Sequence, residues 1–383
     1  MSLRSGLCLF VLLILCAGMA LAVPFTTTLA TYPVGTAPRG VVVFGNNFAV
    51  ANGGSNNVSV YVGSCTTVSC SYTLRGPYAS GKGPTSIDKG HFTDATRWDL
   101  VTSDNVDGTV SILVNDGTNR FPTKITVPGV ANAPETVVVG DFDGNGGADI
   151  AVTNAWAADA RVYLLLNSCT GPCPNPTFTK TALPILPNSQ LPWGLAKGRF
   201  TGAGDRDLVV ANYYSRFYGL YGADVLLNNR EAVPNTPPWL GFAAPATLPG
   251  GFYAPYVTTG RFTKTTGRDD FAITNYGGQV LVFTNADNQG HFTLPAVVNA
   301  AGGSPLAITN AGDLNGDNID DLVVTEFYSK QIVVLYSNGG GSYTAQPPKT
   351  VGANPSALVA SDLGGGTMLI VVNENDNNVM ILK

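Results

Sequence analysis

The chain has 383 residues, of which 44% are hydrophobic and only 12% charged, and its net charge of −5 comes without a cluster of basic residues. A protein that binds nucleic acid needs a cationic surface, so this charge distribution argues against a nucleic-acid partner. The abundance of glycine, asparagine, threonine and valine is typical of an all-β protein with many tight turns.

Residues 1–22 have the pattern of a secretory signal peptide. Arg4 supplies a positive start, Leu7 to Cys16 is an apolar run, and Ala20-Leu21-Ala22 is a small-x-small cleavage site. We therefore expect a secreted, extracellular protein whose mature part, 23–383, is a single domain. No later segment has the roughly 18 apolar residues that a membrane span needs, so we expect no span in the mature chain.

The four cysteines beyond residue 22 form two close pairs, Cys65 with Cys70 and Cys169 with Cys173. An even number, local pairing and an exported chain predict two disulfides, each closing a short turn. A zinc site is the alternative, and it is disfavoured because the pairs lie far apart and lack a nearby histidine. Asn57 begins a glycosylation sequon, which has meaning only in a eukaryotic secretory pathway.

A proline recurs along the chain, each time just before an aliphatic strand-like run. The intervals are 46, 50, 58, 63, 50 and 50 residues, between Pro38, Pro84, Pro134, Pro192, Pro255, Pro305 and Pro355. Each unit holds short aliphatic runs separated by Gly, Asn and Asp turns; in the third unit they are 136–142, 149–154, 161–167 and 178–183. Such self-similarity predicts a seven-bladed β-propeller of four-stranded antiparallel blades.

The last unit offers only three strand-like runs, at 357–363, 368–374 and 379–383. Residues 25–34 form another strand-like run that has no blade of its own. We therefore expect this N-terminal strand to join the C-terminal blade and close the ring, which removes an exposed sheet edge. A linear solenoid would need polar caps at both ends, and the final strand is apolar.

Two glycine-rich loops carry oxygen-bearing side chains at alternate positions. They are GDFDGNGGADIAVTN at 140–154, with Asp141, Asp143, Asn145 and Asp149, and GDLNGDNIDDLVVTE at 312–326, with Asp313, Asn315, Asp317 and Asp321. Alternate carboxylates and amides can all point toward one hard cation, and glycines let the backbone wrap it. We expect one structural Ca²⁺ in each loop. The alternative is a metal-free turn, which the same residues also favour.

These two loops resemble the FG-GAP/VCBS repeat family, the repeat of the integrin α-subunit propeller, and the trailing strands (VSILVNDGTNRF, 110–121) support the match. The resemblance covers essentially all of 23–383. It implies a propeller with calcium held in the loop that joins the first two strands of some blades. It does not fix the function, because the family includes adhesion receptors, lectins and enzyme-associated domains.

The same loop recurs in the fourth and fifth units with arginine at its first position. Arg199 and Arg261 stand where the first Asp should be, and Asp207 and Asp269 keep the last position. Arginine cannot ligate calcium, but its charge can pair with a carboxylate. We therefore expect Arg199 to pair with Asp207, and Arg261 with Asp269, in place of the ion. The alternative is that these loops are degenerate and solvated.

Strand order places the acidic loops and both cysteine pairs on one face, and the second-to-third and blade-to-blade connections on the other. That other face is rich in aromatic residues: Trp156, Trp193, Tyr213, Tyr214, Phe217, Tyr218, Tyr221, Phe252, Tyr253, Tyr256, Tyr276, Phe327 and Tyr328. Loop aromatics suit a glycan or a protein ligand. The candidates for ligand contact are Trp156, Trp193, Tyr213, Tyr214, Tyr218 and Tyr253. The alternative is that such residues seal the seams between blades.

The sequence gives little support for catalysis. Its two histidines, His91 and His291, have no evident partners, and no nucleophile elbow, metalloprotease or P-loop motif occurs. We therefore expect a secreted, calcium-stabilised module that binds or adheres to an extracellular glycan or protein. The alternatives are a polysaccharide-active lyase or hydrolase, and a structural surface or matrix protein.

Overall fold

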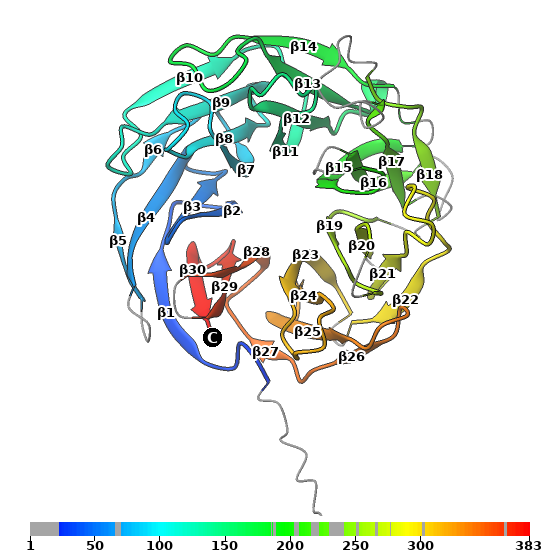
Figure 1. The fold of residues 1–383 in the computed structure, drawn as a ribbon. Coiled ribbons are helices and arrows are strands. Elements are labelled where there is room, and N and C mark those ends of the chain that lie inside the picture. The colour runs from blue at the N-terminus through cyan, green and yellow to red at the C-terminus, as the bar shows by residue number, and fades with distance from the viewer. Residues whose placement is uncertain are drawn as a thin grey trace, which may run out of the picture.

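The computed structural model describes residues 23–65, 70–184, 186, 189–202, 207–215, 222–229, 241–249, 253–264, 267–275, 277–300, 303–363 and 366–383. Seven antiparallel sheets surround one axis (Figure 1). Each sheet has a path of four strands, and two sheets carry one further short strand. The expected seven-bladed β-propeller is confirmed.

The innermost strands are β2 (Pro38–Phe44), β7 (Pro84–Gly90), β11 (Pro134–Gly140), β15 (Ser189–Gly198), β19 (Val257–Gly260), β23 (Pro305–Gly312) and β28 (Pro355–Asp362). The second strands are β3 (Asn47–Asn52), β8 (Asp99–Asp104), β12 (Asp149–Asn154), β16 (Asp207–Ser215), β20 (Asp270–Asn275), β24 (Asp321–Glu326) and β29 (Thr367–Asn373). Blades are numbered here from the one that begins with β2.

The third strands are β4 (Asn57–Cys65), β9 (Thr109–Val114), β13 (Arg161–Asn167), β17 (Ala223–Leu226), β21 (Gln279–Phe283), β25 (Gln331–Ser337) and β30 (Asn378–Leu382). The outermost strands are β5 (Cys70–Leu74), β10 (Thr123–Val127), β14 (Phe178–Ala182), β18 (Ala246–Leu248), β22 (Ala296–Asn299), β26 (Tyr343–Ala345) and β1 (Thr28–Pro33). The short pieces are β6 (Tyr78–Ala79), β27 (Lys349–Thr350) and the 3₁₀ helix η1 (Ala157–Asp159).

The ring is closed by the N-terminal strand. β1 pairs antiparallel with β30 as the outermost strand of blade 7. Just beyond the strand, the N–H of Thr27 donates to the carbonyl of Lys383 at 3.0 Å, and the N–H of Lys383 donates back at 2.9 Å. This pairing confirms the expected closure, and it covers the edge of β30 that would otherwise face solvent.

The hydrophobic core is divided among the seams between blades. Seven hydrophobic clusters each combine residues of two adjacent blades. Every residue of β8, β12, β20 and β24 is buried, because neighbouring blades cover both faces of these strands. Just after the inner strands, Phe92, Phe142, Phe200 and Phe262 lie fully buried in the seams. The seams therefore hold each blade rigidly in place.

Both expected disulfides are present. Cys65 is bonded to Cys70 across the junction of β4 and β5, and Cys169 is bonded to Cys173 in the connection between β13 and β14. The alternative of a zinc site on these cysteines is therefore wrong. Across the part of the chain that the structure describes, no helix has the length and apolar character required to cross a membrane.

Candidate functional site

A cavity of about 210 Å³ lies at the mouth of the central channel, where the inner strands begin. One residue from every blade lines it, and each directly follows the repeat proline or its equivalent: Arg39, Thr85, Glu135, Trp193, Tyr256, Leu306 and Ser356. Tyr213, Pro255, Phe327 and Glu374 complete the lining. We call this cavity the axial pocket. It opens on the face of the second-to-third and blade-to-blade connections, which is the predicted ligand face.

Aromatic rings form one side of the axial pocket. The ring of Trp193 lies 4.9 Å from that of Tyr213, which lies 5.3 Å from that of Tyr253 (distances between centroids). Tyr253 is 40% exposed and stands at the rim. Packed rings of this kind present a rigid apolar surface that stacks on a ligand. The structure thus brings three of the six predicted ligand residues together.

The other three predicted ligand residues are not part of this cluster as described. Trp156 is 50% exposed, next to η1, and does not line the axial pocket. Tyr218 lies outside the described residues. Tyr214 pairs with Leu191 through the backbone of β16, and only its backbone is described. Whether any of the six contacts a ligand stays a prediction.

Three ionisable side chains, one arginine and two glutamates, line the axial pocket. Nε of Arg39 lies 3.4 Å from a carboxylate oxygen of Glu374. Glu135 is only 6% exposed, and its carboxyl accepts a hydrogen bond from Nδ2 of Asn105 at 3.0 Å. Burial raises the pKa of Glu135 to about 8, although the charge of Arg39 and the Asn105 hydrogen bond act against this rise. Glu135 is therefore largely protonated at neutral pH.

These charged residues were missed because the sequence analysis looked for aromatic loops and for motifs. The signal that would have found two of them is the position after the repeat proline. In a propeller the start of each inner strand faces the axis, so this one register position supplies a side chain from each blade to the same point. Arg39 and Glu135 occupy it.

The acidic loop of blade 3 gathers three carboxylates. Oxygen atoms of Asp141, Asp143 and Asp149 lie within 4.8 Å of one another, and no other group of this kind occurs among the described residues. Burial, and to a smaller extent the charge of Asp143, raises the pKa of Asp149 to about 7. Nδ2 of Asn145 donates to the Asp143 carboxylate at 3.2 Å. This set of converging hard oxygens fits a divalent cation such as Ca²⁺, which stays a prediction.

The acidic loop of blade 6 is organised differently. The carboxylate of Asp313 accepts hydrogen bonds from the backbone N–H groups of Gly316 at 2.6 Å, Asp317 at 3.1 Å and Asn318 at 2.8 Å. Burial alone would raise the pKa of Asp313, but these donors hold it below its ordinary value. Nδ2 of Asn315 donates to Asp317 at 3.2 Å. The loop thus has the hydrogen bonds of an Asx-type turn, and its calcium ion also stays a prediction.

The last Asp of the loop has a structural role in five blades. One carboxylate oxygen accepts N–H donors from the start of the loop, and the other accepts the N–H of a residue at or just after the end of the third strand. The five are Asp99, Asp149, Asp207, Asp270 and Asp321. We call this arrangement the aspartate staple. It ties three strands of a blade together through hydrogen bonds from the backbone.

The predicted pairing of Arg199 with Asp207 is wrong. Asp207 forms a staple, accepting from the N–H groups of Phe200 at 2.9 Å and Asn228 at 2.8 Å. The guanidinium of Arg199 instead donates to Asp269 of the next blade at 3.1 Å. The reason is that backbone donors already satisfy the buried Asp207 carboxylate, so the arginine extends toward the seam.

The predicted pairing of Arg261 with Asp269 is also wrong, because Asp269 pairs with Arg199 and the backbone of Arg261 bonds to Asp320. The N–H of Arg261 donates to the Asp320 carboxylate at 2.9 Å, and the N–H of Asp320 donates back to the Arg261 carbonyl at 3.1 Å. The blade-5 loop has one residue more than the blade-4 loop, so Asp270, and not Asp269, forms the staple. Asp269 is thereby left to face Arg199 across the seam.

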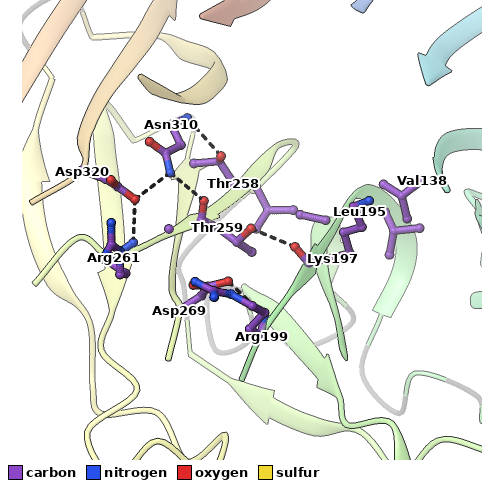
Figure 2. Close-up of a pocket in the computed structure, with 13 residues that line it drawn as sticks. Val138, Leu195, Lys197, Arg199, Thr258, Thr259, Arg261, Asp269, Asn310 and Asp320 are labelled. Carbon is purple, nitrogen blue, oxygen red and sulfur yellow. Dashed lines mark hydrogen bonds and ion pairs between the residues drawn. The ribbon is translucent and has the colours of Figure 1, made fainter. Parts of the chain in front are cut away.

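A wider cavity of about 620 Å³ lies at the other end of the inner strands β15 and β19 (Figure 2). Its polar groups bind one another across blades 4, 5 and 6. The hydroxyl of Thr259 donates to the carbonyl of Lys197 at 2.8 Å, and Nδ2 of Asn310 donates to Asp320 at 3.0 Å. The Arg199–Asp269 pair belongs to the same network (Figure 2). This cavity is therefore a polar junction between blades.

The FG-GAP-like repeat family matches residues 90–152, from the end of β7 to β12. This chain carries an FG-GAP-like repeat. The match includes the acidic loop of blade 3, which confirms the resemblance found in the sequence. No curated protein sequence matches the chain.

The FG-GAP-like propeller is similar in fold to several solved structures. Virginiamycin B lyase from Staphylococcus aureus is 13% identical, with a TM-score of 0.61 over 92% of this chain and 98% of that one. BBS1N, in complex with ARL6DN, is 12% identical, with a TM-score of 0.60 over 94% and 96%. A protein from Lactobacillus plantarum is 16% identical, with a TM-score of 0.57 over 84% and 86%. Identities this low show the fold alone.

Proposed function

We propose that this protein is a secreted binding or adhesion module that takes a sugar residue of an extracellular glycan into the axial pocket. The observation that carries the proposal is the pocket itself, where seven blades each place one side chain around a small cavity with aromatic and hydrogen-bonding groups. Such a concave site with a few placed polar groups is typical of small-ligand recognition.

The size of the axial pocket favours a glycan over a protein surface. Its volume of about 210 Å³ is below the ~300–1,000 Å³ of drug-sized pockets, so it suits a single ring at the end of a longer chain. A stable protein interface instead buries ~800 Å² on each partner. Tyr253 and Tyr328 are 40% and 68% exposed, and their rings contact Tyr213 and Phe327 of the lining, so they extend the contact beyond the first ring.

Export and calcium belong to the same proposal. Disulfides persist mainly in oxidising compartments, so Cys65–Cys70 and Cys169–Cys173 support secretion by way of the predicted signal at 1–22. Calcium in the acidic loops of blades 3 and 6 would neutralise their carboxylates and stabilise the fold. These loops lie on the face opposite to the axial pocket, so we infer that the metal acts on stability and not on ligand contact.

The test is a glycan array followed by calorimetric titration of the best ligand. Trp193→Ala and Tyr213→Ala should weaken binding at least tenfold, because each removes a ring from the wall of the pocket. Val106→Ala is the control: it shortens a 71% exposed apolar side chain in the turn between β8 and β9, on the same face but outside the pocket lining, and binding should be unchanged. If the control lost binding and the pocket variants kept it, the ligand would lie elsewhere on this face.

A polysaccharide-active enzyme is the second candidate. The observation in its favour is Glu135, a buried carboxyl in the pocket that keeps its proton near neutral pH, as a general acid must. Turnover of polysaccharides by the wild type, with loss of turnover but not of binding in Glu135→Gln, would establish this candidate. Binding without turnover would leave the binding module.

A further inference from the structure

The axial pocket has more carboxyl groups than cationic groups. One cationic side chain, Arg39, and two carboxylic side chains, Glu135 and Glu374, line it. Arg39 forms its ion pair with Glu374, which lies toward the rim. Glu135 lies deeper, is 6% exposed, and has a neutral hydrogen-bond partner in Asn105. The deeper carboxyl therefore lacks a full counter-charge, and because an uncompensated buried anion is costly, it keeps its proton in the free protein.

The rings around this carboxyl favour a cation. Trp193, Tyr213, Tyr256 and Phe327 all line the same cavity. The faces of aromatic rings attract ammonium groups and repel anions. An anionic sugar would meet the Glu374 carboxylate and the ring faces together, and a neutral sugar would offer no cation to Glu135 or to the rings.

We propose that the axial pocket selects glycans that carry a free ammonium group, namely amino sugars, with the ammonium placed against Glu135 and the aromatic wall. This inference rests on the proposed function and names its substrate class. The ammonium supplies the counter-charge that the Arg39–Glu374 pair does not give to Glu135. Binding then ionises Glu135, and the proton leaves to solvent.

The groups that face Glu135 define the expected proton release. They are Arg39 from β2, Tyr256 at the start of blade 5, Glu374 from the turn after β29, and Asn105 from the turn after β8. Because Glu135 is largely protonated in the free protein at neutral pH, an ammonium ligand should displace close to one proton on binding. A neutral ligand should displace none.

The experiment compares glucosamine oligosaccharides with N-acetylglucosamine oligosaccharides of equal length, at a pH at which the amino group is protonated. The two ligands share the sugar ring and differ in charge. We expect the wild type to bind the free amine at least tenfold more tightly. Calorimetry in two buffers of different ionisation enthalpy should count the released proton, and this measurement needs no variant. Glu135→Gln should remove both the preference and the proton release, and Val106→Ala, outside the pocket, should keep both.

The outcomes separate the two proposals. Equal affinity for both ligands, or tighter binding of the N-acetylated one, overturns the amino-sugar inference and leaves the glycan-binding function standing. A preference for the amine with no proton release in the wild type also overturns it, because Glu135 is then not the partner. Absence of binding to both ligands, and to every glycan of the array, overturns the proposed function as well.

Discussion

Replacement of Glu135 by glutamine should change how the stability of the propeller depends on pH. Glutamine keeps the shape of the side chain and its hydrogen bond from Asn105, but it cannot ionise. The pKa of Glu135 rises from 4.5 in the unfolded chain to about 8 in the folded protein. Between these values the folded state holds one proton more than the unfolded state, so the wild type loses stability as pH rises from about 4.5 to about 8.

The magnitude follows from the size of the shift. Each pKa unit corresponds to about 1.4 kcal/mol, so the wild-type protein should lose on the order of 3–5 kcal/mol of unfolding free energy across this window through Glu135. The variant loses none of it. Asp149 and Asp321 also have raised pKa values, but they are the same in both proteins and cancel in the comparison.

Urea unfolding in the presence of a chelator measures the effect. At pH 5 the two proteins should have similar free energies of unfolding, and at pH 9 Glu135→Gln should be the more stable by several kcal/mol. A difference between the proteins that is the same at pH 5 and pH 9 would refute the reasoning, since it would place Glu135 in contact with enough water to ionise freely.

Three further predictions test the frame of the propeller. Deletion of residues 25–34 should lower the melting temperature and cause association through the bare edge of β30; an unchanged melting curve would contradict the closure. Asp143→Ala should remove about one equivalent of Ca²⁺ in a calorimetric titration and should lower the melting temperature only when calcium is present, whereas unaltered stoichiometry would place the ion elsewhere. Asp207→Ala should cost more than ~2 kcal/mol of unfolding free energy, because buried N–H donors lose their acceptor. By comparison, Arg199→Ala should cost less than ~1 kcal/mol of unfolding free energy, because the arginine side chain is 43% exposed. A larger loss in Arg199→Ala than in Asp207→Ala would contradict the structural role of the aspartate staple.

The propeller and its closure could be predicted because they follow from periodicity. The recurring proline is the first residue of the inner strand in five of seven blades; β15 begins three residues before Pro192, and β19 begins two residues after Pro255. The last unit holds three strand-like runs, and the run at 25–34 has no blade of its own, so pairing the two leaves no open edge. Both disulfides followed from local spacing, because cysteines four or five residues apart can meet only across a turn.

The partners of the loop carboxylates could not be predicted, because spacing does not say which way a side chain points. Asp207 and Asp269 look alike in the sequence, yet one faces its own blade and the other faces the preceding one. A single added residue before Asp270 decides the difference. Each carboxylate points toward backbone N–H groups of a turn that require an acceptor, and the sequence does not show where those N–H groups lie.

Two positions of the repeat serve two different tasks, rigidity at one and ligand recognition at the other. The aspartate staple stands at the end of the first-to-second loop, where it is the same residue in five blades and serves rigidity. The position after the repeat proline stands at the opposite end of the inner strand, where all seven blades differ: Arg, Thr, Glu, Trp, Tyr, Leu and Ser. Since a change there alters the axial pocket without touching the staples, one frame can present many pockets. The residue after the repeat proline differs in every blade, whereas the staple aspartate is the same in five. This contrast is the feature of the chain that points to ligand recognition.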